Sequence, residues 1–368
     1  MLDLAARALE SIQRDNERDP DLLCSPEGVC LATFWRQATP GVSYYRCLLP
    51  ARYLPGQMVK FDLDRIGWDM DYELGDVHGL RLPLHRGVAV WSYLGDDARA
   101  RVACALQDQG VRTLMECDDN YTQGPKKWGV NWADTHQEAQ GVIGYSHEQN
   151  RYLANLMDGM IVSTPYLAEV YGEFNDNVYV CRNSIDPFDW NDILPQKHDD
   201  LRIVYAGSNV HVFDYPLVNK ALKWAHRQPG VESWIWGFDP PPSYRGNVEG
   251  WVDGLDEYRK NLARFDIGLC PLQDTPWNRS KSDIKAIEYA MAGVLPIVAR
   301  TEAYAPWWRD LGWEYVAQTE NEWQEIIRHL VKNYDEVVSA AAAAKKYVIT
   351  QRTIYDEIGA WREAILGA

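Results

Sequence analysis

The sequence NRSKSDIKAIEYAMAG, residues 278–293, is the main basis for the fold that we predict for this chain. We expect a polar loop, a helix of about three turns and a stop at a glycine. Ser280 and Asp283 have the spacing of a capping box, and Gly293 stands where a left-handed residue ends many helices. One helix face is apolar, because its residues recur at intervals of three and four: Ile284, Ile287 and Met291.

The opposite face of this helix carries charge, at Lys281, Lys285 and Glu288. Two lysines near a helix N-terminus repel each other and oppose the helix dipole. A bound anion would offset both costs, because the free N–H groups of the first turn already face it. Glu288 could then accept hydrogen bonds from hydroxyls attached to that anion. The pattern predicts a diphosphate and a polyol held side by side; the alternative is a solvated face with a Lys285–Glu288 pair.

The residues that follow, VLPIVA at 294–299, favour the ligand site. A short apolar run after a tight turn is typical of a buried parallel strand. It places the charged helix start at the rim of a doubly wound α/β sheet, where ligands bind.

The motif K-S-x-x-K-x-x-E-Y-x-x-x-G, followed by a buried strand, resembles the donor-site signature of glycosyltransferases with the GT-B fold. It is most similar to the retaining group 1, or family 4-like, enzymes. The resemblance implies two Rossmann-like domains facing across a cleft, with Glu288 on the donor ribose. It also implies that the loop and helix start hold the diphosphate, through Asn278, Ser280, Lys281, Ser282 and Lys285. This chain has Ser280 where the family has a further glutamate, so backbone groups of residues 275–278 are expected to contact the sugar.

A second donor segment is predicted where a strand at residues 201–206 runs into a small-residue loop. Gly207 and Ser208 would let backbone N–H groups approach a phosphate. The resemblance places this loop on the diphosphate, with the remaining donor contacts from Asn209, His211, Trp251 and Val252. Trp251 and Val252 would meet the nucleobase through their backbone. A single histidine at a helix start is also often a cap.

In the first half of the chain, residues 28–34 form an expected strand, and the following Tyr45 and Arg46 resemble the G-x-x-x-Y-R entry of the same enzymes. The resemblance places both near the acceptor; the alternative is a packed tyrosine and a surface arginine. No GxGxxG motif follows the strand, so no NAD or FAD is expected.

A strand at residues 112–117 ends in Asp118 and Asp119, followed by asparagine. Acidic residues at the carboxyl end of a parallel strand are well placed for catalysis, and this strand end resembles the E-x-D-D of several relatives. The alternative is a turn with solvated carboxylates. Because the sequence is not a DxD motif, we expect no metal ion and no required cofactor. Catalysis would be mainly electrostatic, with Lys281 and Lys285 stabilising the leaving diphosphate.

Lys126 and Lys127 lie among aromatic residues and are candidates for the acceptor site. Such a combination could stack on and neutralise single-stranded DNA or an extruded base, or equally form the floor of a sugar-binding groove. The formal net charge of −16 disfavours DNA as a partner, so a glycan, protein or small-molecule acceptor is preferred.

The chain of 368 residues has room for two domains. We expect an N-terminal acceptor domain at residues 1–190, a donor domain at 200–350, and a C-terminal helix at 351–368 that crosses back to the first domain. The seven cysteines show no CxxC spacing, and neither a signal peptide nor a membrane-spanning run is recognisable, so a cytoplasmic protein is expected.

The predicted function is that of a metal-independent glycosyltransferase that moves a hexose from a UDP- or GDP-sugar to an acceptor hydroxyl, with retention. Three alternatives stay open at this stage. They are a glycosyltransferase acting on hydroxymethylated bases of phage DNA, a sugar-nucleotide 2-epimerase and a non-catalytic nucleotide-sugar-binding module.

Overall fold

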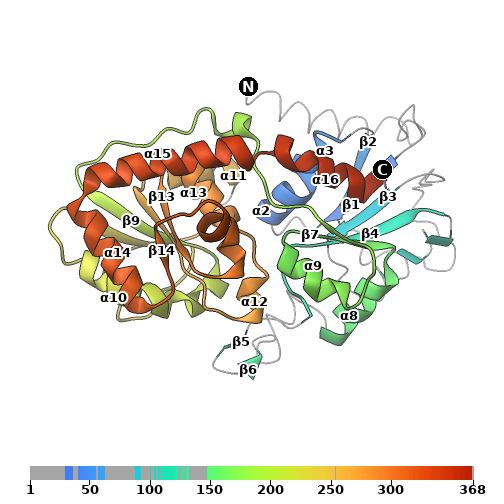
Figure 1. The fold of residues 1–368 in the computed structure, drawn as a ribbon, viewed down its shortest axis with the longest axis horizontal. Helices are drawn as coiled ribbons and strands as arrows, with labels where there is room; N and C mark the ends of the chain where they lie inside the picture. Colours follow the sequence, from blue (N-terminus) through green and yellow to red (C-terminus); the bar gives the residue numbers. More distant parts are fainter. Residues whose placement is uncertain are drawn as a thin grey trace. The chain divides into compact units, whose positions relative to one another are not determined.

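The computed structural model describes most of the chain beyond residue 110 and parts of the chain before it. The described residues are 30–35, 40–54, 57–62, 88–92, 100, 103–104, 107–108, 110–122, 126–127, 130–131, 147–252 and 254–366. The chain divides into two compact units (Figure 1). Unit 1 comprises Met1–Arg182 together with Glu357–Ala368, and unit 2 comprises Asn183–Asp356. The chain therefore changes units earlier than the predicted boundary at residue 190.

Unit 1 contains a parallel sheet with the strand order β2-β1-β3-β4-β7-β8. Its strands are β1 (Cys30–Trp35), β2 (Gln57–Asp62), β3 (Val88–Ser92), β4 (Arg112–Cys117), β7 (Gly159–Val162) and β8 (Val178–Val180). The predicted strand at residues 112–117 is confirmed. A short antiparallel hairpin, β5 (Lys126–Lys127) with β6 (Val130–Asn131), is separate from this sheet.

The described part of unit 1 contains several helices between its strands. They are α2 (Pro40–Ser43), the π-helix η2 (Tyr44–Leu48), α3 (Leu49–Ala51), α8 (His147–Leu156) and α9 (Pro165–Gly172). Most of α16 (Ile354–Leu366) also belongs to this unit. Arg112 at the start of β4 donates from Nη1 to the carbonyl oxygen of Ala364 at 2.7 Å, so a charged side chain satisfies the last turn of α16.

Unit 2 contains a second parallel sheet, with the order β11-β10-β9-β12-β13-β14. Its strands are β9 (Leu201–Ala206), β10 (Val231–Trp236), β11 (Asn247–Glu249), β12 (Ile267–Cys270), β13 (Leu295–Ala299) and β14 (Val316–Ala317). Numbered within the unit, this order is 3-2-1-4-5-6, the arrangement of Rossmann folds. Every residue of β12 and β13 is buried, which explains their almost continuous apolar sequences.

The helices of unit 2 include α10 (Tyr215–Ala225), α11 (Leu255–Leu262), α12 (Pro276–Arg279), α13 (Ile284–Met291), α14 (Glu320–Lys332) and α15 (Tyr334–Gln351). Short helices complete the unit: η3 (Pro187–Trp190), η4 (Asn209–Phe213), η5 (Glu302–Tyr304) and η6 (Pro306–Asp310). In Figure 1, α15 runs along α13, and α14 packs against α10. Among the described residues, no helix combines the length and the apolar character that crossing a bilayer requires.

The helix that the opening motif predicts is α13, and it ends as expected. Ile287 and Met291 are buried, and Gly293 has a φ of 80°, in the left-handed region. The predicted capping box is wrong. Asp283 precedes the helix without a side-chain cap, and Ser280 instead ends the short helix α12, which begins after a Thr275 cap. A proline at the first position of α12 starts a separate helical turn there.

Candidate functional site

The strand order of unit 2 places a candidate ligand site at the carboxyl ends of β9 and β12. These two strands are neighbours in the sheet. The strand after β9 lies toward one edge of the sheet, and the strand after β12 lies toward the other edge. A crevice forms at such a switch point in doubly wound sheets, and ligands bind there. Gly207 follows β9, Gly237 follows β10, and the segment that leads to α13 follows β12. The predicted donor residues of unit 2 therefore share one edge of the sheet.

Lys285, in the first turn of α13, reaches back to the end of β9. Its Nζ donates to the carbonyl oxygen of Ala206 at 2.7 Å and lies 5.6 Å from the ring centre of Tyr205. A Cβ on Gly207 would lie 3.0 Å from the same Nζ, so glycine at this position makes room for the ammonium group. One carbonyl oxygen leaves two of the three ammonium hydrogens for other acceptors.

The pKa of Lys285 is lowered to about 8, chiefly by burial. The charges of Cys270, Asp214 and Glu288 oppose this shift, and the charge of Lys281 adds to it. Burial and then the charge of Lys285 lower the pKa of the neighbouring His211 to about 4, so this imidazole is neutral at pH 7. The site thus holds positive charge that an anion would stabilise.

Asp214 organises the loops around this lysine. Its Oδ1 accepts hydrogen bonds from Gln273 N and from Asn278 Nδ2, both at 2.8 Å, and its Oδ2 lies 3.7 Å from His211 Nδ1. A Cβ on Gly207 would lie 2.6 Å from His211 Cδ2. Asn278 and His211 therefore hold the two loops in place. Ser208 is exposed and lies between Gly207 and η4, and Asn209 begins η4.

Glu288 lies one turn beyond Lys285 and is nearly buried, with 7% of its surface exposed. Tyr258 Oη donates to Glu288 Oε2 at 3.1 Å. The Tyr258 ring stacks against Trp236, with 5.1 Å between ring centres, and against Trp251, with 6.2 Å. Trp251 is 55% exposed, so the aromatic stack ends in an open indole. Val252 follows it and is half-buried.

Gly237 allows this aromatic stack to lie close to the loop that begins at Gly207 after β9. Its φ is 94°, and a Cβ there would lie 2.5 Å from Gly207 O and 3.0 Å from Trp251 Cε3. Sequence reasoning missed Gly237 and Tyr258. The glycine stands directly after a strand, as Gly207 does, and that signal could have found it; nothing in the sequence marks Tyr258.

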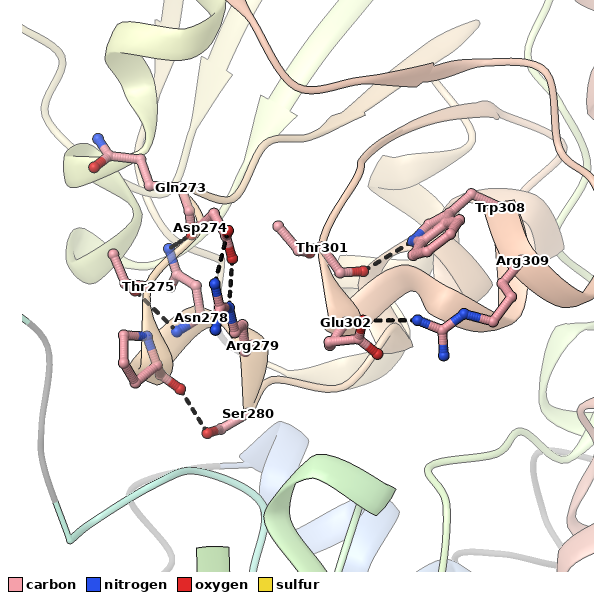
Figure 2. A network of polar contacts seen from close by, with 11 residues as sticks. Gln273, Asp274, Thr275, Asn278, Arg279, Ser280, Thr301, Glu302, Trp308 and Arg309 are labelled. Carbon is pink, nitrogen blue, oxygen red and sulfur yellow. Dashed lines mark hydrogen bonds and ion pairs between the residues drawn. The ribbon is translucent and has the colours of Figure 1, made fainter. Parts of the chain in front are cut away.

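Figure 2 shows the segment around α12 beside the segment that follows β13. Ser280 Oγ donates to Pro276 O at 2.8 Å, and Ser280 is fully buried, so its side chain does not line the site. Asp274 receives two hydrogen bonds from Arg279, at 2.6 and 2.9 Å. Lys281 Nζ lies 4.9 Å from the ring centre of Trp277, and Ser282 Oγ accepts from Asn183 at 2.7 Å.

Unit 1 holds the predicted acceptor and acidic residues. Arg46 is 1% exposed; its Nε lies 2.6 Å from Glu116 Oε1, and its guanidinium lies 4.9 Å from the ring centre of Trp361. It is therefore not a surface arginine, and its acceptor role stays a prediction. Tyr45 is also buried and packs edge-on against Tyr44.

Asp118 and Asp119 follow β4 and are half-buried, and Asp119 O accepts from Tyr171 Oη at 3.3 Å. Lys126 and Lys127 form β5, but their side chains lie outside the described part of the structure. The catalytic role of the two aspartates and the acceptor role of the two lysines stay predictions.

No protein-family model matches the sequence, and no curated protein matches it. Solved structures do match in fold. TarM from S. aureus, in complex with fondaparinux, alpha-GlcNAc-glycerol and UDP, has 12% identity and a TM-score of 0.54 over 76% of this chain and 55% of TarM. HepE from Anabaena, in complex with UDP and glucose, has 11% identity and a TM-score of 0.59 over 92% of this chain and 99% of HepE.

A trehalose-6-phosphate synthase, studied for glycosyl transfer with retention, has 11% identity and a TM-score of 0.57 over 92% of this chain and 98% of that enzyme. This chain thus spans about half the length of TarM and nearly all of the other two. At these identities the likeness concerns the fold, and it confirms the predicted class, GT-B with two Rossmann-like domains.

Proposed function

We propose that this chain is a glycosyltransferase that uses a nucleoside diphosphate sugar as its donor. The observation that carries the proposal is the placement of Lys285 and Glu288. They lie on the same face of α13, about one turn apart, at the switch point of the unit 2 sheet. A cation and a carboxylate at that spacing match the two polar parts of such a donor, its diphosphate and its ribose.

The diphosphate is assigned to the space beside Gly207 and Lys285. The ammonium of Lys285 is partly desolvated, which strengthens its interaction with an anion. It would stabilise the charge that develops on the leaving diphosphate, and that is the main catalytic contribution we assign to the donor unit. Lys281 would add to the positive potential from the segment before α13.

The nucleoside is assigned to Glu288 and the exposed indole of Trp251. Glu288 would accept hydrogen bonds from the ribose hydroxyls while Tyr258 keeps it in place. A base could stack on Trp251, which is stacked in turn on Tyr258. UDP is the donor nucleotide that we favour over GDP, since TarM and HepE were both solved with UDP.

Retention of the anomeric configuration is part of this proposal. It is supported by the similarity to the trehalose-6-phosphate synthase and by the donor motif. Because Ser280 is buried, the transferred sugar would be contacted by the backbone of the 275–278 segment. We also propose a cytoplasmic location, since Cys104, Cys117, Cys181 and Cys270 are in no disulfide, as in a reducing compartment.

Transfer of label from UDP-sugars to a panel of acceptors tests the proposal. The panel contains glycans, glycerol glycosides, hydroxymethylated DNA and unmodified DNA. Labelling of a glycan or glycoside, with retention seen by NMR of the first product, is expected. Labelling that requires the modified DNA would establish the DNA-acting alternative. Release of a free epimerised sugar without any acceptor would establish an epimerase, and nucleotide binding without turnover would leave a binding module.

A further inference from the structure

A buried ion pair holds the start of the donor helix. Arg352, the residue after α15, donates from Nη2 to Asp283 Oδ1 at 2.8 Å and from Nη1 to Asp283 Oδ2. Trp307 Nε1 donates to the same Oδ2 at 3.1 Å. Arg352 and Asp283 are each 3% exposed. Since Asp283 immediately precedes α13, these bonds fix the residue from which the helix begins.

The segments by which the chain enters and leaves unit 2 meet at the same place. Asn183, the first residue of the unit, donates from Nδ2 to Ser282 Oγ at 2.7 Å, and its carbonyl accepts from Arg352 Nη2 at 3.3 Å. Ile185 forms a parallel bridge with Thr353. Both chain segments are therefore bonded to each other and to the two residues before α13.

Stability alone is a weak reason for a buried ion pair, because apolar side chains of similar size often stabilise a fold equally well. The location of this pair suggests a second role. An uncompensated carboxylate at Asp283 would repel a diphosphate at the start of α13 and would compete for Lys285, two residues further on. Arg352 neutralises that carboxylate. Burial alone would lower the pKa of Arg352, but the charge of Asp283, its hydrogen bonds and a contribution from Tyr347 together raise it, so the guanidinium stays charged.

We propose that Arg352 is a positioning residue for the donor diphosphate. It acts through Asp283, by fixing and neutralising the start of α13 so that Lys285 faces Gly207. The inference rests on the proposed function and adds that donor binding depends on the two segments that join unit 2 to unit 1.

The test compares UDP with uridine, because only UDP reaches the start of α13. Arg352→Lys keeps the charge and loses the two-pronged geometry. Calorimetry on the full chain is expected to show an increase of about tenfold in the Kd for UDP and no change for uridine. Leu330→Ala, a fully buried position in α14, is the matched control: it should lower the unfolding temperature and leave both Kd values unchanged.

An unchanged ratio of the two Kd values in Arg352→Lys would overturn the proposal and make the pair a stability element only. Asn183→Ala removes the bond to Ser282, leaves the ion pair, and is expected to shift the ratio in the same direction. If neither variant folds, the contacts of the two joining segments are required for folding and the proposal fails. A wild-type protein that binds neither UDP nor uridine contradicts the proposed function itself, which is a separate result.

Discussion

At the scale of single residues, Lys285 and Glu288 each have a partner that the sequence does not suggest. Lys285 donates to the carbonyl at the end of β9, and Glu288 accepts from Tyr258 on α11. Both partners lie far away in the sequence, so the helix spacing that reveals the two charged residues cannot show what keeps them in place. These contacts leave a lysine with a lowered pKa beside a glycine, and a glutamate bonded to a tyrosine that stacks on an exposed indole.

The lowered pKa of Lys285 predicts how donor affinity depends on pH. Because bound diphosphate favours the charged ammonium, it raises the pKa of Lys285 above the value of about 8 in the free protein. UDP affinity should therefore be level up to that pH and then fall, by up to about tenfold per pH unit, as the free protein loses the proton. Titration calorimetry above about pH 7 avoids the second ionisation of a terminal phosphate near pH 6.

Lys285→Met serves as the control for this titration. It should bind UDP more weakly at neutral pH, and its affinity should not fall above pH 8. The same fall in both proteins would show that another group is responsible.

Glu288→Ala tests the ribose assignment. The variant should lose about 1.5–3 kcal/mol of UDP binding free energy, the usual contribution of a hydrogen bond to a charged group. Wild-type protein should lose a similar amount when UDP is replaced by its 2′,3′-dideoxy analogue, and the variant should not distinguish the two ligands. If the variant still prefers UDP, the ribose lies elsewhere.

At the scale of elements, the sequence predicts α13 and its glycine stop well but misplaces its start. Periodicity and a buried strand are local signals, and they determine where Ile287 and Gly293 lie. The start depends on Arg352 and Trp307, which come from other parts of unit 2. The spacing of Ser280 and Asp283 would give a capping box only if the Asp283 carboxylate were available to the backbone. In the fold that carboxylate bonds to Arg352 and Trp307 instead.

Gly237→Ala tests whether the turn after β10 shapes the site. The new Cβ would meet the backbone oxygen of Gly207 at 2.5 Å, at a φ of 94° that disfavours alanine. We expect the free energy of unfolding to fall by more than about 1 kcal/mol and UDP binding to weaken. Gly250→Ala is the control, because no atom lies within 4 Å of a Cβ there. Equal behaviour of the two variants in urea unfolding and in calorimetry would contradict this account of the turn.

At the scale of the whole molecule, the resemblance of the donor motif to GT-B enzymes predicts two Rossmann-like domains, and the two six-stranded parallel sheets confirm them. The strand order could not be predicted, because each parallel strand looks alike in sequence. The burial of Arg46 could not be predicted either, because its partners Glu116 and Trp361 are 70 and 315 residues away. The assignment of donor and acceptor roles to the two units stays a prediction.

For the enzyme as a whole, we expect that glycosyl transfer needs no divalent metal. Cationic side chains beside the diphosphate would supply the neutralisation that a metal provides elsewhere. Activity measured after treatment with EDTA should equal that of the untreated enzyme. Loss of activity in EDTA and its return with Mn²⁺ or Mg²⁺ would instead indicate Asp118 and Asp119 as candidate ligands.

The proposed function requires that unit 2 bind a nucleoside diphosphate sugar through Lys285 and Glu288. Titration calorimetry with UDP, GDP, ADP and dTDP tests it most directly, on the wild-type chain and on the Lys285→Met and Glu288→Ala variants. We predict one saturable site per wild-type chain, tightest for UDP and weakened in both variants while their unfolding temperatures stay close to that of the wild type. The absence of binding by all four nucleotides, or affinities in both variants equal to those of the wild type, would contradict the claim.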